Sequence, residues 1–171
     1  IFKGPRVDDH SLRNPVEDWL AAGGKFHPKK RRGIDTPGGP IKDLAKLWKA
    51  IGEISNPAIR DAFSLMLLTG LRRDEALKLR WQDIDFDVGT LTVTETKNGK
   101  PLSIPLSSQV REILERCLKA GKLPWVFPSP TSESGHIEDP HHLYKTLSTQ
   151  VGEKVYAHAF RNTFIHVAIG E

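Results

Sequence analysis

Residues 62–75 read Ala-Phe-Ser-Leu-Met-Leu-Leu-Thr-Gly-Leu-Arg-Arg-Asp-Glu, an apolar run that becomes strongly charged over its last few positions. The segment from Ala58 to Leu68 is apolar on nearly all sides, which predicts a buried central helix, and Pro57 suits its first turn. Thr69-Gly70 ends that helix, and a second short helix is predicted from Asp74 to Arg80. The stretch therefore predicts a helical core with two arginines where one helix gives way to the next.

Apolar residues at helical spacing predict further helices on both sides of this stretch. One covers residues 41–51, and another follows a serine cap at residue 107 or 108. Two more are predicted over residues 140–151, with Asp139 as the N-cap, and over residues 157–169. The residues expected to pack in the core from these helices, together with the tryptophans, are Ile41, Leu44, Leu47, Trp48, Ile51, Trp81, Val110, Ile113, Leu114, Cys117, Leu118, Trp125, Leu143, Leu147, Val151, Phe160, Phe164 and Val167.

A small antiparallel sheet is predicted between the helices. Leu91 and Val93 alternate with threonines over residues 90–96, and a second alternating run covers residues 102–106. Asn98-Gly99 between the two runs is a strong signal for a tight hairpin turn. The fold class is therefore α+β and mainly α, a helical domain with a small antiparallel β-sheet.

The composition bounds the class of protein. The 171 residues suit one compact domain, and 38% hydrophobic with 27% charged residues is ordinary for a globular chain. The single cysteine excludes an internal disulfide framework and a cysteine-based zinc finger. The longest apolar run, residues 62–71, is too short to cross a bilayer. We expect a reduced, cytoplasmic protein without a membrane segment.

The excess positive charge lies at the start of the chain. The net charge is +4, and the first fifty residues hold eleven Lys/Arg against six Asp/Glu, whereas the rest holds fourteen against fifteen. A basic end on a nearly neutral body suits a polyanion partner, most often a nucleic acid. On charge alone, however, a solvated basic tail is the simpler explanation.

Residues 1–40 differ from the rest in composition. The basic segment Lys25-Phe26-His27-Pro28-Lys29-Lys30-Arg31-Arg32 is followed by prolines and glycines over residues 36–40, a combination typical of a linker. We place a domain boundary near residue 40. The chain begins at Ile1 rather than at a methionine, so we expect it to be a piece of a longer protein.

Two arginines lie where folding alone does not ask for them. Arg72 and Arg73 are at the start of a predicted helix, although the helix dipole disfavours a cation there by up to about 1 kcal/mol. Backbone N–H groups and a guanidinium converging on one point suit an oxyanion. A surface turn whose arginines pair with Asp74 and Glu75 explains the same residues equally well.

Two further places carry unexplained cations. Lys97 and Lys100 face each other across the predicted hairpin, where like charges repel. His158 and Arg161 share one face of the last helix and together suit a phosphate. Taken singly, an exposed hairpin tip and an exposed helix face are the commoner explanations. His141-His142 are adjacent and point apart on a helix, so no metal site is predicted there.

In chain order, these places form a pattern. The sequence reads Thr-Gly-Leu-Arg-x-x-Glu-Ala-Leu-x-Leu-x-Trp-x-Asp-Ile-Asp from Thr69, Thr-Lys-Asn-Gly-Lys from Thr96, and His-x-x-Arg-x-Thr-Phe from His158. From about Ile41 to its end, the chain resembles the catalytic domain of tyrosine recombinases of the phage integrase family. A single His-x-x-Arg is a weak motif, but three blocks in this order and on these elements are a strong signal.

The resemblance implies a role for each charged group. Arg72 and Arg161 match two arginines that hold the scissile phosphate, and Lys97 matches a general acid on the hairpin. His158 matches a histidine that orients the phosphate and assists proton transfer, and Glu75 matches an acidic support for the arginines. The DNA-backbone contacts implied are Lys25, Lys29, Lys30, Arg31, Arg32, Arg73 and Lys100.

The resemblance also implies the activity and the partners. The intact protein would be a site-specific recombinase, or integrase, that cleaves and rejoins double-stranded DNA through a 3′-phosphotyrosine, without metal or cofactor. It would act as a homotetramer on DNA, encoded by a bacterium or phage and associated with the nucleoid, whereas this piece is expected to be monomeric. Residues 1–40 match the end of an N-terminal DNA-binding domain plus a basic linker, and residues 41–171 match the catalytic domain.

One departure from the family pattern concerns the nucleophile. The family places its tyrosine some tens of residues after the position of Arg161, and Tyr144 and Tyr156 both precede it. We therefore expect a catalytic domain that lacks its nucleophile segment and is inactive on its own. Two alternatives are a truncated, non-catalytic DNA-binding module that regulates a full-length relative, and a metal-free nuclease that uses water.

Overall fold

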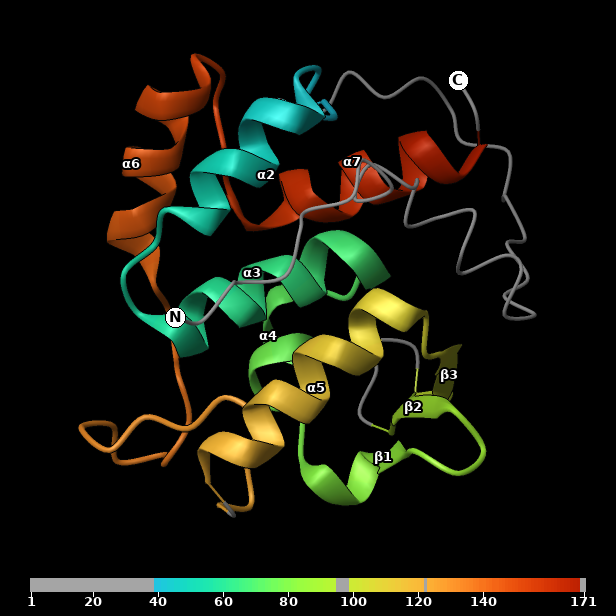
Figure 1. Ribbon diagram of the computed structural model, residues 1–171. Helices are drawn as coiled ribbons and strands as arrows, with labels where there is room; N and C mark the ends of the chain where they lie inside the picture. Colours follow the sequence, from blue (N-terminus) through green and yellow to red (C-terminus); the bar gives the residue numbers. More distant parts are fainter. Residues whose placement is uncertain (1–38, 95–98, 122, 170–171) are drawn as a thin grey trace, which may run out of the picture.

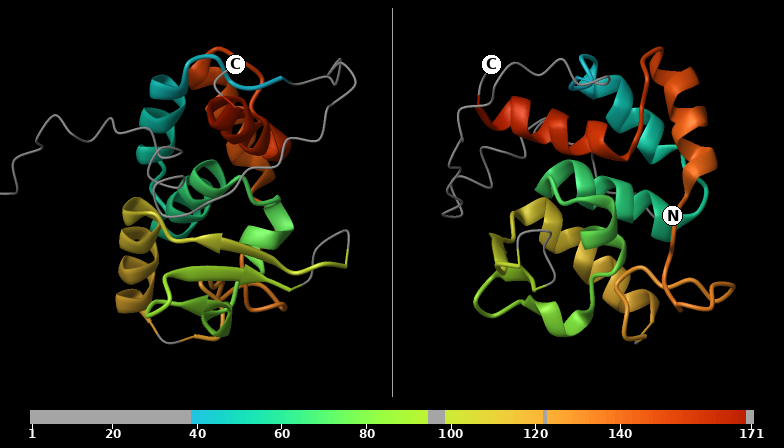
Figure 2. Two further views of the ribbon diagram at one scale, coloured as in Figure 1. Left: turned by 90° about the vertical axis from the view of Figure 1, so that its right-hand side faces the viewer. Right: turned by 180° about the vertical axis from the view of Figure 1, so that it is seen from behind.

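The structure is a computed structural model that describes residues 39–94, 99–121 and 123–169. Its centre is helix α3 (Pro57–Thr69), which contacts α2 (Leu44–Gly52), α4 (Arg73–Leu77), α5 (Ser108–Ala120) and α7 (Ala157–Ile169). Helix α6 (His141–Val151) packs against α2. Helices α2, α6 and α7 lie on one side of α3, and α5 and the sheet lie on the other (Figures 1 and 2).

Helix α3 forms where its sequence predicts it. The Asn56 side chain accepts hydrogen bonds from the backbone N–H groups of Ala58 and Ile59, and the chain leaves the helix at Gly70 in the left-handed conformation. Every residue over 61–69 is buried. Phe63 stacks on Tyr144 of α6 and lies against Phe160 of α7, so one aromatic side chain joins three helices. The predicted central buried helix is confirmed.

Helix α4 is shorter than predicted. It ends at Leu77, because the chain beyond it extends and hydrogen-bonds to residues 124–126 instead of continuing the helix. The N–H of Val126 donates to the carbonyl of Leu79, and the N–H of Trp81 donates to the carbonyl of Pro124. The prediction of a helix as far as Arg80 was wrong. A 3₁₀ turn, η2 (Trp81–Asp83), follows.

The sheet has three antiparallel strands in the order β1-β2-β3. They are β1 (Ile84–Asp85), β2 (Thr90–Val93) and β3 (Leu102–Pro105), and Leu91 on β2 faces Ile104 on β3. The first strand was not predicted, because two residues show no alternation. Helices with this small sheet confirm the predicted α+β, mainly α, class.

The other helices match their sequence signals with local corrections. Ser107 caps α5, and α7 covers the predicted residues. Helix α6 begins at His141 with Pro140 at its N-cap, so the predicted cap at Asp139 was wrong; that carboxylate instead binds Arg73. Trp48 and Leu118 are 43% and 39% exposed rather than in the core. In the described part of the chain, no helix is long and apolar enough to cross a membrane.

Candidate active site

Arg72 is fixed by the carboxylate of Glu75, three residues further along the chain. The Arg72 backbone N–H donates to Glu75 Oε2 at 2.9 Å, and Arg72 Nη1 donates to Glu75 Oε1 at 2.7 Å. The Glu75 side chain is 5% exposed, whereas that of Arg72 is 37% exposed. One buried carboxylate therefore caps the start of α4 and also holds a half-exposed guanidinium in place.

Arg161 is fixed from the turn that precedes Arg72. Its Nη1 donates to the carbonyl of Gly70 at 2.5 Å, which joins α7 to the end of α3. Gly70 has φ +65°, and a Cβ at this position would run into the ring of Phe164. The turn at residues 70–72 therefore anchors both arginines. The Gly70 carbonyl binds the Arg161 guanidinium, and Arg72 itself stands at the start of α4.

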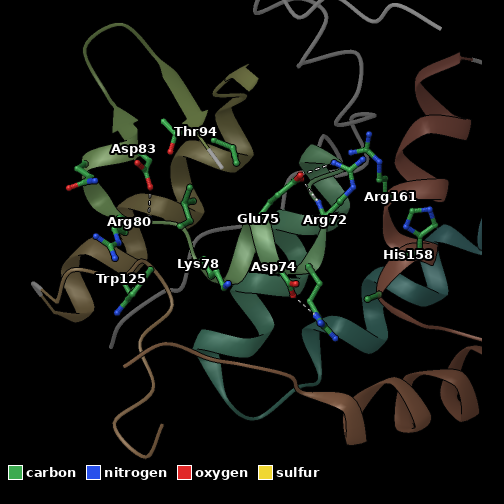
Figure 3. Close-up of a pocket in the computed structure, with 15 residues that line it drawn as sticks. Arg72, Asp74, Glu75, Lys78, Arg80, Asp83, Thr94, Trp125, His158 and Arg161 are labelled. Carbon is green, nitrogen blue, oxygen red and sulfur yellow. Dashed lines mark hydrogen bonds and ion pairs between the residues drawn. The ribbon is translucent and has the colours of Figure 1, made fainter. Parts of the chain in front are cut away.

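His158 completes this group. It is exposed and precedes Arg161 by one turn of α7, so both side chains lie on the same side of that helix, facing Arg72 and Glu75 (Figure 3). The structure thus brings together four residues that the sequence singled out: Arg72, Glu75, His158 and Arg161. Two guanidinium groups and an imidazole at one place suit the binding of a single oxyanion.

These residues line a pocket of about 560 Å³. Its walls come from α4 and residues 78–83 that follow it, the end of β2, Trp125 between α5 and α6, and the start of α7. The lining holds five Lys/Arg and three Asp/Glu, so it is positive overall. The complete lining is Arg72, Arg73, Asp74, Glu75, Lys78, Leu79, Arg80, Gln82, Asp83, Val93, Thr94, Trp125, Ala157, His158 and Arg161.

Most of the remaining predicted site residues lie outside the described part of the chain. This applies to the hairpin lysine Lys97 and to Lys25, Lys29, Lys30, Arg31 and Arg32. Val93 and Thr94 line the pocket, so strand β2 ends beside it. Lys100 is described, is exposed and is not among the lining residues.

Arg73 points to different partners from Arg72. Its Nε donates to Asp74 Oδ1 and its Nη1 donates to Asp139 Oδ2, each at 2.8 Å. The hydrogen bond that this guanidinium donates to Asp74, with the charges of Asp74 and Asp139, raises its pKa above the usual value. Arg73 therefore joins α4 to the loop before α6. Its predicted contact with a DNA backbone stays a prediction.

Several lining residues were not predicted as part of the site. Lys78, Arg80 and Trp125 line the pocket beside α4. Arg80 was assigned to a helix and Trp125 to packing, so no sequence signal linked them. Their proximity follows from the backbone pairing of residues 79–81 with residues 124–126.

Neither tyrosine of the chain lines the pocket. Tyr144 is 7% exposed, and burial raises the pKa of its phenol well above the usual value. Its hydroxyl has no hydrogen-bond partner among the described residues. The described residues also contain no group of three or more His, Cys, Asp or Glu side chains that could hold a metal ion.

Comparisons with known proteins show which family the chain resembles. The family model described as Phage integrase family matches residues 41–166. Prophage integrase IntZ of Escherichia coli strain K12 is 30% identical over 173 aligned positions, which cover 96% of this chain and 40% of that protein. The chain thus spans well under two thirds of this relative.

Solved structures share the fold. The crystal structure of XerA recombinase has a TM-score of 0.61 at 20% identity, covering 84% of this chain and 53% of that one. The Tn1549 transposon integrase in complex with circular intermediate DNA has a TM-score of 0.57 at 20% identity, covering 78% and 54%. Since the family model spans most of the chain and includes both anchored arginines, the chain belongs to the phage integrase family.

Proposed function

We propose that residues 41–171 are the phosphate-binding part of the catalytic domain of a site-specific DNA recombinase, or integrase. The observation that carries the proposal is the convergence of Arg72, His158 and Arg161 on one pocket, with Glu75 beneath the first arginine. Membership of the phage integrase family supports the same function.

The chemistry follows from what each group does to a phosphodiester. Arg72 and Arg161 bind the non-bridging oxygens and stabilise the negative charge that grows on them in the transition state. A tyrosine oxygen of the intact protein attacks phosphorus and forms a 3′-phosphotyrosine as the bond to the 5′ oxygen breaks. Lys97 gives the leaving 5′ oxygen its proton, and His158 orients the phosphate and assists that transfer. Arginines and a lysine supply the positive charge, so the proposal needs no metal or cofactor.

The nucleophile is neither of the two tyrosines in this chain. Both lie outside the pocket lining, and Tyr144 is held in the core against Phe63 with a raised pKa. A phenol needs its pKa lowered or a base beside it to attack at neutral pH, and burial acts in the opposite direction. We therefore propose that residues 1–171 alone bind the phosphate without forming a covalent adduct.

Double-stranded DNA is the proposed partner. The positive lining of the pocket supports this, as does the Tn1549 integrase structure, which contains DNA. Residues 1–40 would be the end of an N-terminal DNA-binding domain plus a basic linker, and the intact protein would act as a tetramer on DNA at the nucleoid, with this piece monomeric alone. The proposed backbone contacts are Lys25, Lys29, Lys30, Arg31, Arg32, Arg73 and Lys100.

A covalent-trapping experiment tests this function. The full-length protein, incubated with sheared genomic DNA from its source, should give protein–DNA complexes that survive detergent. Arg72→Ala and Arg161→Ala should lose those complexes and retain most of their DNA binding without detergent, since contacts elsewhere provide affinity. Lys49→Ala, an exposed change on α2, is the matched control and should behave as wild type. Detergent-resistant complexes that persist in both arginine variants would contradict the proposal.

A further inference from the structure

The pocket extends well beyond the group of Arg72, His158 and Arg161. Figure 3 shows further side chains on the other side of α4: Lys78 lies beside this helix, and Arg80 and Trp125 lie next to each other farther along the pocket. A pocket of about 560 Å³ offers more room than one phosphate group fills. These further side chains therefore have space for another part of the ligand.

Arg80 lies on an aromatic platform. Its guanidinium carbon is 4.4 Å from the centroid of the Trp125 ring, a separation at which the cation is attracted to the face of the ring. The backbones of the two residues also pair as an isolated antiparallel bridge. Arg80 thus contacts Trp125 through both its side chain and its main chain.

The Trp125 ring is itself immobilised. The His136 ring meets it edge-on with centroids 4.7 Å apart. Gly135 has φ +75° and passes so close that a Cβ there would lie 3.3 Å from Trp125 Nε1. Hydrogen bonds of 2.9 and 3.2 Å, on either side of the bridge, join residues 79–81 to residues 124–126. The Trp125 ring is therefore held on several sides, and it offers the Arg80 guanidinium a fixed surface to lie on.

Lys78 and Arg80 differ from Arg72 and Arg73 in their partners. Among the described residues, ion pairs bind Arg72 to Glu75 and Arg73 to two aspartates, but no carboxylate pairs with the side chains of Lys78 or Arg80. Asp83, which also lines the pocket, accepts a hydrogen bond from the backbone N–H of Arg80. Two exposed cations that pair with no carboxylate in the described part of the chain, one of them a planar guanidinium lying on an aromatic ring, suit a phosphodiester.

We propose that Arg80, positioned by Trp125, binds a second backbone phosphate of the DNA together with Lys78, separate from the phosphate held by Arg72 and Arg161. The inference rests on the proposed function, because it takes DNA as the ligand. The contact reads no base. It fixes how the strand lies along the pocket, and so which phosphate reaches the reacting group. Arg80 is thus a positioning residue.

The salt dependence of binding tests this contact, since each phosphate neutralised changes the slope of log K against log salt by about 0.9. Residues 1–171 are titrated with a fluorescent duplex of mixed sequence at several salt concentrations. Arg80→Gln and Lys78→Gln should each lower the slope and weaken binding several-fold at low salt, and their combined loss of slope should be about 0.9 at most, because both cations contact one phosphate. Arg80→Lys should keep the slope, because the charge stays.

Arg111→Gln is the matched control. Its guanidinium also lies over an aromatic ring, 5.5 Å from the centroid of Phe86, but it is not among the pocket residues. It should keep the wild-type slope. Thermal unfolding of each variant shows whether it is folded, and if Arg80→Gln is not, Lys78→Gln carries the test.

The outcomes separate this inference from the function on which it rests. If wild-type protein shows no salt-dependent binding to the duplex, the proposed function fails. If wild type binds and Arg72→Gln lowers the slope, but Arg80→Gln and Lys78→Gln do not, only the second phosphate contact is wrong. The same slope change in Arg111→Gln as in Arg80→Gln would also overturn it.

Discussion

The guanidinium of Arg161 is hydrogen-bonded to the carbonyl of Gly70, a residue 91 positions earlier in the chain. Two residues after Gly70, Arg72 begins the next helix and is held by Glu75. The end of the central helix therefore sets the separation between the two arginines. Packing in the core and geometry in the pocket are joined at this one turn.

Gly70→Ala should damage both the fold and the pocket. The residue has φ +65°, and the added Cβ would meet the ring of Phe164. Strain at such a φ and overpacking each cost about 1–3 kcal/mol, so we expect the free energy of unfolding to fall by roughly 2–6 kcal/mol. Urea unfolding measures the loss.

Gly52→Ala is the matched control, because Gly52 is not at positive φ and nothing lies within 4 Å of a Cβ built there. Alanine is favoured over glycine in a helix by up to about 1 kcal/mol, so this variant should be as stable as wild type or more so. Equal stability for Gly70→Ala and wild type would show that the turn is not the rigid anchor described above.

Glu75→Ala should destabilise α4 and release Arg72. The change removes the acceptor of the Arg72 N–H together with the buried partner of its guanidinium. Loss of such a cap and charged hydrogen bond costs about 1–3 kcal/mol. Glu75→Gln keeps an oxygen for the N–H and should cost less. In the full-length protein both variants should lose DNA cleavage, measured as detergent-resistant complexes.

Glu115→Gln provides the comparison for these variants. Glu115 pairs with Arg111 at 3.8 Å on an exposed face of α5, and such surface pairs contribute roughly 0–1 kcal/mol. We expect Glu115→Gln to change the free energy of unfolding by an amount near the bottom of that range. DNA cleavage by the full-length variant should be normal. A loss for Glu115→Gln as large as that for Glu75→Ala would mean that the buried position of Glu75 has no special effect.

The sequence predicted those parts of the fold that depend on neighbouring residues. Helix α3 has its cap, its apolar surface and its glycine stop within a single segment, and residues 157–169 carry one continuous pattern. The grouping of Arg72, Glu75, His158 and Arg161 came from three motifs in order rather than from periodicity. The structure adds the contacts that bring the motifs together.

The errors occur where residues distant in the sequence decide the local structure. Arg80 does not continue the helix because its neighbours hydrogen-bond to residues 124–126, and nothing between residues 74 and 80 indicates that partner. Asp139 does not cap α6 because Arg73 binds its carboxylate. Lys78, Arg80 and Trp125 were missed as pocket residues for the same reason.

Thr163→Val should weaken the attachment of the chain at the start of the domain. The Thr163 hydroxyl accepts a hydrogen bond from the backbone N–H of Ile41 at 2.9 Å, and both residues are buried. Valine leaves that N–H without an acceptor, which costs about 1–3 kcal/mol in the free energy of unfolding. Thr163→Ser keeps the hydroxyl and should recover much of the loss.

The comparison for this prediction is Thr149→Val. The Thr149 hydroxyl donates to a carbonyl one turn earlier in α6 and is exposed, so its removal leaves no buried group unsatisfied. We expect a change within about 0.5 kcal/mol. Hydrogen exchange should show faster opening at Ile41 in Thr163→Val but not in Thr149→Val. Unchanged exchange at Ile41 would contradict the tie between residue 41 and α7.

Cys117 should be unreactive in the folded protein and should make its stability fall in alkali. Burial, with the nearby Asp61 carboxylate 3.6 Å away, raises the pKa of the thiol to about 12. Thiolate is the reactive form, so a disulfide reagent at pH 8 should label the native protein slowly and the unfolded protein quickly.

The pH dependence follows from the direction of the shift. The folded protein holds the thiol proton more tightly than the unfolded chain, so this contribution to stability is complete below the unfolded pKa, near 9. It declines as the pH rises from there toward about 12, the folded value. Tyr144, whose pKa is also raised, acts in the same direction. Cys117→Ala should therefore reduce the alkaline loss of unfolding free energy, and Tyr144→Phe should reduce it independently. If the free energy of unfolding fell equally with alkaline pH in wild type and Cys117→Ala, the thiol would have to be protonated to the same degree in the folded and unfolded states.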